Sequence, residues 1–297
     1  MAAVEWMRRS TWTCLTGALL VVPMLTAVPA GATSSSTKDA AAIRRSVSQT
    51  AARGSAHIAG EVDYTSGSTS GKVTSSGVVD FSNRNLSLTV DVSQLTHEPA
   101  SVEVRVVDGD AYVDVGPLLH IVPLGALAQL ANIQWVKLSP GELSTSLSPQ
   151  GVTPVLGTDA EALLQALQGV SNGSIARVGA DTVRGVPTIR YHADVNLQLA
   201  LSKLPAGLQS RLQGELASVA NPTAIPVEVW IDSAGLVRRV AISVTVHPKN
   251  GTPVRLDASF DLFDFGVPVS VQPPPANEVT DLSALRNLIQ VSRAPAD

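Results

Sequence analysis

The chain has a single cysteine, Cys14, among 297 residues. One thiol can neither close an intramolecular disulfide nor form a multi-cysteine metal site. The stability of the folded chain must therefore come from packing.

Aromatic and charged residues are both scarce. Aromatic side chains make up 4% of the chain and charged ones 15%, whereas hydrophobic residues make up 44%. The predicted core is therefore aliphatic, built mainly from valine, leucine, isoleucine and alanine. The net charge of −4 gives no basic field for a polyanion, so we predict no nucleic-acid partner.

The short motifs of common catalytic and cofactor sites are also absent. The sequence has no phosphate loop, dinucleotide fingerprint, His-Glu-x-x-His pair or calcium loop. Residues 67–71 have the outline of a nucleophile elbow, but Thr69 stands at its centre. The five histidines lack the spacing of metal ligands: His57, His97, His120, His192 and His247. We predict that the protein is no enzyme and needs neither a cofactor nor a metal.

The first residues have the features of an export signal. Two arginines precede an apolar stretch over residues 15–28, and Ala30-Gly31-Ala32 offers a small-residue cleavage site. Pro23 interrupts the stretch, which is short for a membrane span. We predict a signal peptide over residues 1–32 and a secreted or cell-envelope protein, with a retained N-terminal anchor as the alternative.

Apolar and polar residues alternate through much of the remaining chain. Period-two alternation indicates strands with one dry and one wet face, as in antiparallel sheets. The turn signals Asp108-Gly109 and Asp232-Ser-Ala-Gly235 join neighbouring runs. We expect roughly eight to ten strands. The strand regions are 55–92, 102–115, 133–139, 175–195, 227–232, 240–246 and 254–265.

Helical periodicity occupies other parts of the chain. Residues 33–54 are predicted to form a mobile leader (33–38) and a helix (38–53) that ends at Gly54. Residues 55–290 form the predicted single domain, and 291–297 a disordered tail. Further helices are predicted in the second half of 118–132 and at 159–167, 196–219 and 281–289.

Several polar-face residues have a functional and a structural interpretation. Trp135 and Trp230 could lie at a ligand rim, but we favour packing against outer neighbours. His192 and His247 are expected to be solvated. Strand spacing does not force Asp261 and Asp264 together, so no glycosidase-type carboxylate pair is predicted.

The order of these segments resembles the LolA-like family, specifically the LppX/LprG-type lipoproteins of actinobacterial cell envelopes. No single motif carries the resemblance, which rests on order and spacing across residues 40–285. The matching segments are 134–137 (QWVK), 159–167, 178–191, 226–232 (PVEVWID), 235–239, 263–268 and 273–275 (PPP).

The resemblance implies an α+β fold, in which a curved antiparallel β half-barrel wraps around helices and leaves an apolar cavity for acyl chains. Such proteins bind or carry lipid or acylated molecules, with possible partners in the membrane or among envelope proteins. Members of this type usually have a lipid-modified cysteine directly after the signal. Here Ala32-Thr-Ser-Ser occupies that place, so the chain has no lipobox cysteine.

The strand faces with the clearest alternation are the predicted lining of that cavity. They contain Leu86, Leu88, Val90, Val102, Val104, Val106, Val113, Ile189, Tyr191, Val195, Val227, Val229, Ile231, Val240, Ile242 and Val244. Such a face suits a hollow cavity and a filled core equally. Lipid binding or transport is therefore the leading hypothesis, and a secreted protein-protein interaction module with a filled core is the alternative. A third hypothesis, a hydrolase that acts on envelope material, would need a catalytic set of Ser, His and Asp, and no sequence motif indicates one.

Overall fold

Twelve strands form one sheet in the computed structural model, which describes residues 32–96, 99–119, 134–138, 170–196, 224–246, 252–282 and 284. The first six strands are β1 Ser55–Ser66, β2 Thr69–Asp80, β3 Asn85–Asp91, β4 Ser101–Val107, β5 Asp110–Asp114 and β6 Trp135–Leu138. The others are β7 Val170–Val183, β8 Val186–Asn196, β9 Ala224–Asp232, β10 Val237–Val246, β11 Val254–Phe263 and β12 Val279–Asp281. The helical elements are α1 Ala32–Ala51, α2 Ser93–Thr96, α3 Gly116–Leu119 and the 3-10 turn η3 Ala276–Glu278.

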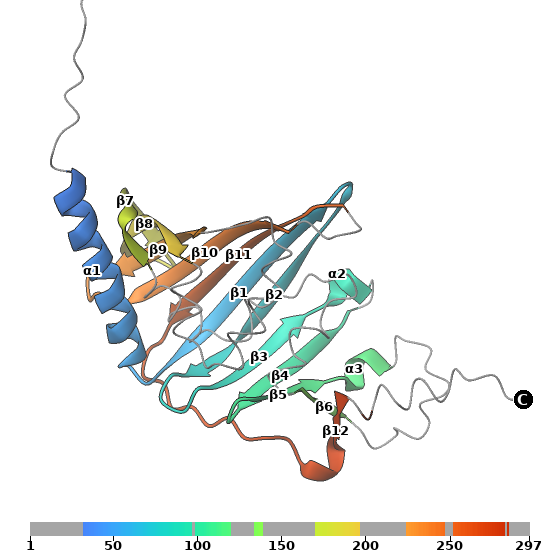
Figure 1. Cartoon of the computed structure of the whole chain (residues 1–297). Coiled ribbons are helices and arrows are strands. Elements are labelled where there is room, and N and C mark those ends of the chain that lie inside the picture. The colour runs from blue at the N-terminus through green and yellow to red at the C-terminus, as the bar shows by residue number, and fades with distance from the viewer. Residues whose placement is uncertain are drawn as a thin grey trace, which may run out of the picture.

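The sheet consists of two antiparallel meanders joined along one strand pair. Its order is β12-β6-β5-β4-β3-β2-β1-β11-β10-β9-β8-β7, so the first strand of one meander pairs with the last strand of the other. Figure 1 shows the sheet as open and curved. The predicted curved antiparallel sheet is confirmed.

The strand count is higher than predicted. The described residues form twelve strands, and β12 lies parallel to β6. Asp281, predicted to begin a helix, is the last residue of β12. A strand of three residues is too short to show alternation in a sequence.

Glycine-containing turns join the hairpins as the turn signals predict. At the β4–β5 turn, Asp108 and Gly109 have φ values of 53° and 86°. Both residues are in the left-handed region that a type I′ turn requires. Gly235 likewise has a φ of 73°, and the Asp232 carboxylate accepts hydrogen bonds from the backbone N–H groups of Ala234 and Leu236 at 2.9 Å.

The strand register divides the sheet into two faces of opposite character. Residues directly opposite on neighbouring strands share a face. One row of partners runs from β4 to β8 through Val102, Val90, Ser75, Gly60, Phe260, Val240, Val229 and Tyr191. Another runs from β6 to β11 through Val136, Val113, Val104, Leu88, Gly77, Ile58 and Leu262. We call the side that carries these rows the inner face, and the opposite, polar side the outer face.

Helix α1 packs on the inner face at the β7–β10 end of the sheet (Figure 1). Ala40, Ile43 and Val47 follow helical spacing and are at most 2% exposed. The helix ends at Ala51, close to the predicted end, and Gly54 follows with a φ of 81°. It begins at Ala32 rather than at Lys38, so the segment predicted as a mobile leader is helical.

The other predicted helices are not tested here. Residues 159–167 and 197–219 lie outside the described residues, as do 120–132 and most of 283–289. In the described part α1 is the one helix longer than a single turn, so a sheet wrapped around several helices is not confirmed. None of the helices in that part is long and apolar enough to cross a membrane. The predicted signal peptide, apart from Ala32, also lies outside it.

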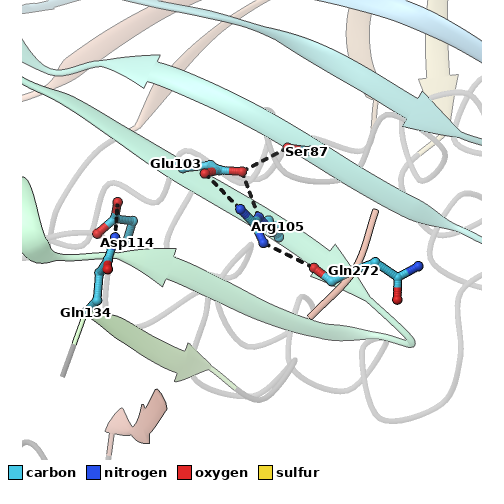
Figure 2. Close-up of polar contacts among 6 residues, drawn as sticks. All are labelled: Ser87, Glu103, Arg105, Asp114, Gln134 and Gln272. Carbon is cyan, nitrogen blue, oxygen red and sulfur yellow. Dashed lines mark hydrogen bonds and ion pairs between the residues drawn. The ribbon is translucent and has the colours of Figure 1, made fainter. Parts of the chain in front are cut away.

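An extended segment, residues 264–278, leads from β11 past the strand ends to β12 (Figure 1). Its backbone is fixed at both ends, because Gly266 N donates to Ser55 O at 2.9 Å and Gln134 N donates to Glu278 O at 3.0 Å. Between these points Arg105 Nη1 donates to Gln272 O at 3.4 Å, as Figure 2 shows. The segment therefore connects the central strand β11 to the edge strand β12.

Candidate functional site

The register places all sixteen predicted cavity residues on the inner face. Ten are buried, with exposed fractions of at most 7%: Leu86, Leu88, Val102, Val104, Val113, Val227, Val229, Ile231, Val240 and Ile242. Five others are half-buried: Val90, Val106, Ile189, Tyr191 and Val244. The side chain of Val195 is outside the described set. The sequence thus predicted the face correctly, and a role for these residues in lining a cavity stays a prediction.

The inner face contains apolar residues beyond the sixteen that were predicted. Five of them lie in the two central strands, β1 and β11: Ile58, Val62, Ala258, Phe260 and Leu262. The alternation of β11 could have identified its three residues. The pattern in β1 is weaker because Gly60 interrupts it.

Gly60 is covered by an aromatic ring from the neighbouring strand. A Cβ atom at this position would lie 2.9 Å from two ring carbons of Phe260. The ring therefore occupies the space above the glycine, and a larger residue there would have to displace it. Phe260 and Gly60 together keep the centre of the inner face continuous.

Arg177 and Tyr191 are polar residues at the β7–β8 end of this apolar face. They are direct cross-strand partners on β7 and β8. Tyr191 packs against the core cluster, and burial raises the pKa of its hydroxyl. The negative charge of Asp39 on α1 also raises this pKa, while Arg177 lowers it through its charge and a hydrogen bond. The inner face therefore ends in a polar cross-strand pair, Arg177 and Tyr191.

The outer face is held together by ion pairs. Arg239 Nη2 donates to Asp261 Oδ2 at 2.8 Å, and Lys72 Nζ donates to Glu61 Oε1 at 2.6 Å. Figure 2 shows Arg105 donating from two nitrogens to Glu103, at 2.7 and 3.1 Å. Such bidentate contacts fix the geometry of both side chains.

Both tryptophans belong to this outer network, which confirms the packing interpretation. Trp135 is 4% exposed beneath the Arg105 guanidinium, which is 4.6 Å from the ring centre. Trp230 is 7% exposed, and its ring lies between Arg190 and Arg239. Each tryptophan ring thus packs against arginines that form ion pairs with carboxylates on the same face.

The acidic and histidine side chains that the sequence singled out have separate partners in the described part of the structure. Asp261 bonds Arg239, whereas Asp264 Oδ2 lies 3.0 Å from His57 Nδ1, so the two carboxylates have different partners. His192 Nδ1 lies 3.0 Å from Glu228 Oε1. In the described ranges no group of three or more His, Cys, Asp or Glu side chains could hold a metal ion. His97, His120 and His247 lie outside those ranges.

An open depression of about 460 Å³ lies on the outer face between β2, β3, β4 and the segment after β3. Its lining includes Thr74, Ser76, Thr89, Asp91 and Ser101. Hydroxyl groups and a carboxylate suit water or polar ligands. The depression lies on the opposite side of the sheet from the candidate face and does not suit an acyl chain.

No family model and no curated protein matches this chain. Among solved structures, it is similar to the lipoprotein LppX of Mycobacterium tuberculosis, with a TM-score of 0.45 and 19% identity over 78% of this chain and 97% of that one. It is similar to LprF of Mycobacterium bovis, with a TM-score of 0.44 and 13% identity over 80% and 98%. A DUF1329 family protein of Desulfovibrio piger matches with a TM-score of 0.34 and 9% identity over 78% and 95%.

Proposed function

We propose that this protein, whose sequence resembles the LppX/LprG type, is an exported, non-enzymatic protein that binds or carries lipid or acylated molecules in the cell envelope. The ligand would lie on the inner face of the curved sheet. Contact with a membrane or an envelope protein would be transient, at the time of loading or release. The observation that carries the proposal is the continuity of the apolar inner face across both meanders.

This continuity depends on the β1–β11 pair. Because these strands are neighbours, the apolar rows of the two meanders form one surface instead of two. Acyl chains gain free energy in proportion to the apolar area removed from water, so a long continuous face suits them. The half-buried residues Val90, Val106 and Val244 mark places where this face is accessible.

The alternative function is a secreted interaction module with a filled core. The low exposed fractions of Val229 and Val240, 0% and 2%, favour this alternative, since tightly packed interiors have such values. The two functions differ in whether the protein holds lipid when it is isolated.

Native mass spectrometry on protein purified from its own exported fraction tests the proposal. The expected result is an added mass that organic extraction removes and identifies as lipid. The extracted protein should then take up a fluorescent fatty acid. A bare mass together with no uptake of fatty acid or phospholipid would refute lipid binding and favour the interaction module.

A matched pair of variants on one strand tests where lipid binds. Val244 lies half-buried on the inner face of β10, and its neighbour Thr245 lies exposed on the outer face. Val244→Trp is expected to reduce lipid loading several-fold, because the indole fills space on the binding face. Thr245→Trp adds the same ring to the other side and should leave loading unchanged. Equal loading of both variants would place the ligand elsewhere.

A further inference from the structure

Arg177 is the only charged residue that the register pairs on the inner face of the described strands. Its cross-strand partner Tyr191 belongs to the row that continues through Val229 and Val240. The inner face is therefore mostly apolar and carries a cation and a phenol hydroxyl at the β7–β8 end. A lipid has the same division between its chain and its headgroup.

A β-bulge places Arg177 on this face. The register shifts between Arg177 and Gly179, so Gly179 and Asp181 lie on the outer face although they continue the same alternation. Gly179 has a φ of 151°, a value that suits glycine in a bulge, and the intervening Val178 is 54% exposed. Bulges of this kind redirect side chains and are common next to binding sites.

Arg177 also differs from the arginines of the outer face in its partners. Those arginines donate hydrogen bonds to carboxylates, as Arg105, Arg190, Arg239 and Arg255 do. Arg177 is exposed, lies directly opposite Tyr191 on the neighbouring strand, and has no ion pair with any described residue. Its guanidinium therefore keeps donors for a further acceptor.

We propose that Arg177 and Tyr191 bind the acidic headgroup, a carboxylate or a phosphate, of a lipid whose acyl chain lies on the inner face. The assignment rests on the proposed lipid-binding function and adds the headgroup class to it. Guanidinium groups bind carboxylate and phosphate through two parallel hydrogen bonds, and a tyrosine hydroxyl adds a third donor.

Asp39 sets the charge balance of this site from the helix side. Helix α1, which carries Asp39, packs against β7, and the negative charge of Asp39 raises the pKa of Tyr191. An acidic headgroup would be repelled by Asp39 and attracted by Arg177, so the two residues have opposite effects on the same ligand. Neutralising Arg177 is therefore expected to weaken binding of an acidic lipid, and neutralising Asp39 is expected to strengthen it.

The test compares a fluorescent fatty acid with its methyl ester, using delipidated exported protein. The two probes share an acyl chain, and only the acid carries a charge. Arg177→Gln is expected to weaken binding of the acid about tenfold, the effect of one charge-assisted hydrogen bond, and to leave the ester unchanged. Asp39→Asn should strengthen binding of the acid and leave the ester unchanged. Arg177→Lys should retain part of the preference for the acid.

Arg255→Gln is the matched control, because it removes the same charge from an exposed position on the outer face. It should change the affinity of neither probe. Equal affinities of acid and ester in the unmodified protein, unaltered by Arg177→Gln, would overturn the headgroup assignment and leave lipid binding intact. Binding of neither probe would overturn the proposed function itself, and the assignment with it.

A third arm separates a lipid headgroup from a free anion. Millimolar inorganic phosphate is expected not to displace the bound fatty acid, because the acyl chain supplies most of the binding free energy. Displacement in the unmodified protein but not in Arg177→Gln would show a site for free phosphate and overturn the assignment to lipid.

Discussion

At the scale of single residues, the outer face is stabilised by charged groups that hold one another in place. Trp230 is an example, since its indole N–H donates to Asp181 Oδ2 at 2.8 Å while Arg190 and Arg239 lie over its ring. That hydrogen bond is the main cause of the lowered pKa of Asp181. The polar side of the sheet is therefore ordered at neutral pH by ionised carboxylates.

Glu228→Gln tests this dependence on ionised carboxylates. Burial opposes ionisation of Glu228, but hydrogen bonds from Arg190 and His192 outweigh burial and lower its pKa from the ordinary value of 4.5. A carboxyl whose pKa is lower in the folded state stabilises the fold above its unfolded pKa, and this stability is lost as pH falls through the folded pKa. The unmodified protein should therefore lose stability more steeply than Glu228→Gln below about pH 4.5, as measured by urea unfolding at several pH values.

Asp108→Asn provides the control for this experiment. Asp108 is exposed in the β4–β5 turn, and asparagine tolerates its positive φ of 53°. This variant should keep the pH dependence of the unmodified protein. A Glu228→Gln profile parallel to that of the unmodified protein would contradict the role given to Glu228.

At the scale of elements, a buried hydroxyl of helix α1 adds a hydrogen bond to the apolar packing of the helix on the sheet. Thr50 is fully buried; its Oγ1 donates to Ser46 O at 2.7 Å and accepts from Val237 N at 2.9 Å. The Val237 N–H needs this partner, because the strand register shifts between Val237 and Arg239. A side chain of the helix thus completes the hydrogen bonding of an irregular strand.

Thr50→Val should lower the free energy of unfolding by about 1–3 kcal/mol, since it leaves a buried N–H without an acceptor. Urea unfolding monitored by circular dichroism measures the change. Ser48→Ala is the control, because Ser48 is an exposed hydroxyl of the same helix that bonds Arg44 O at 3.3 Å. The control should cost less than about 0.5 kcal/mol. Equal effects of both changes would show that the Thr50–Val237 contact adds no stability.

At the scale of the whole molecule, the β1–β11 pair makes two meanders into one sheet. The strands of each meander are neighbours in sequence, whereas β1 and β11 pair across most of the chain, with Ser66 opposite Val254. Their inner faces share one core cluster that includes residues of both meanders and of α1. The described sheet should therefore unfold as one cooperative unit.

The two tryptophans of the sheet report on this cooperativity separately. Trp135 lies in the first meander and Trp230 in the second, and the remaining two, Trp6 and Trp12, precede residue 32. In protein lacking residues 1–31, the single-tryptophan variants Trp135→Phe and Trp230→Phe allow each meander to be followed by fluorescence. Each variant should show a fluorescence transition that coincides with its own transition by circular dichroism. Separate fluorescence and circular dichroism transitions would show that the meanders unfold independently.

The sequence by itself determined the longer strands, the main turns and the apolar side of each of those strands. These features depend on neighbouring residues: alternation assigns faces, and Asp108-Gly109 adopts the positive φ values that its turn needs. For this reason the sixteen candidate residues lie on one face. For the helix that contains Ile43 and Val47, the predicted C-terminal end is close to the observed one.

Only the tertiary structure decided which strands pair and where the alternation is broken. Nothing local in β1 specifies β11 as its partner, because pairing between distant strands depends on how the whole chain buries its apolar surface. The β-bulge beside Gly179 was likewise decided by the tertiary structure. One extra residue reverses the alternation, so Arg177 and Asp181 lie on opposite faces although the sequence pattern alone gives them the same face.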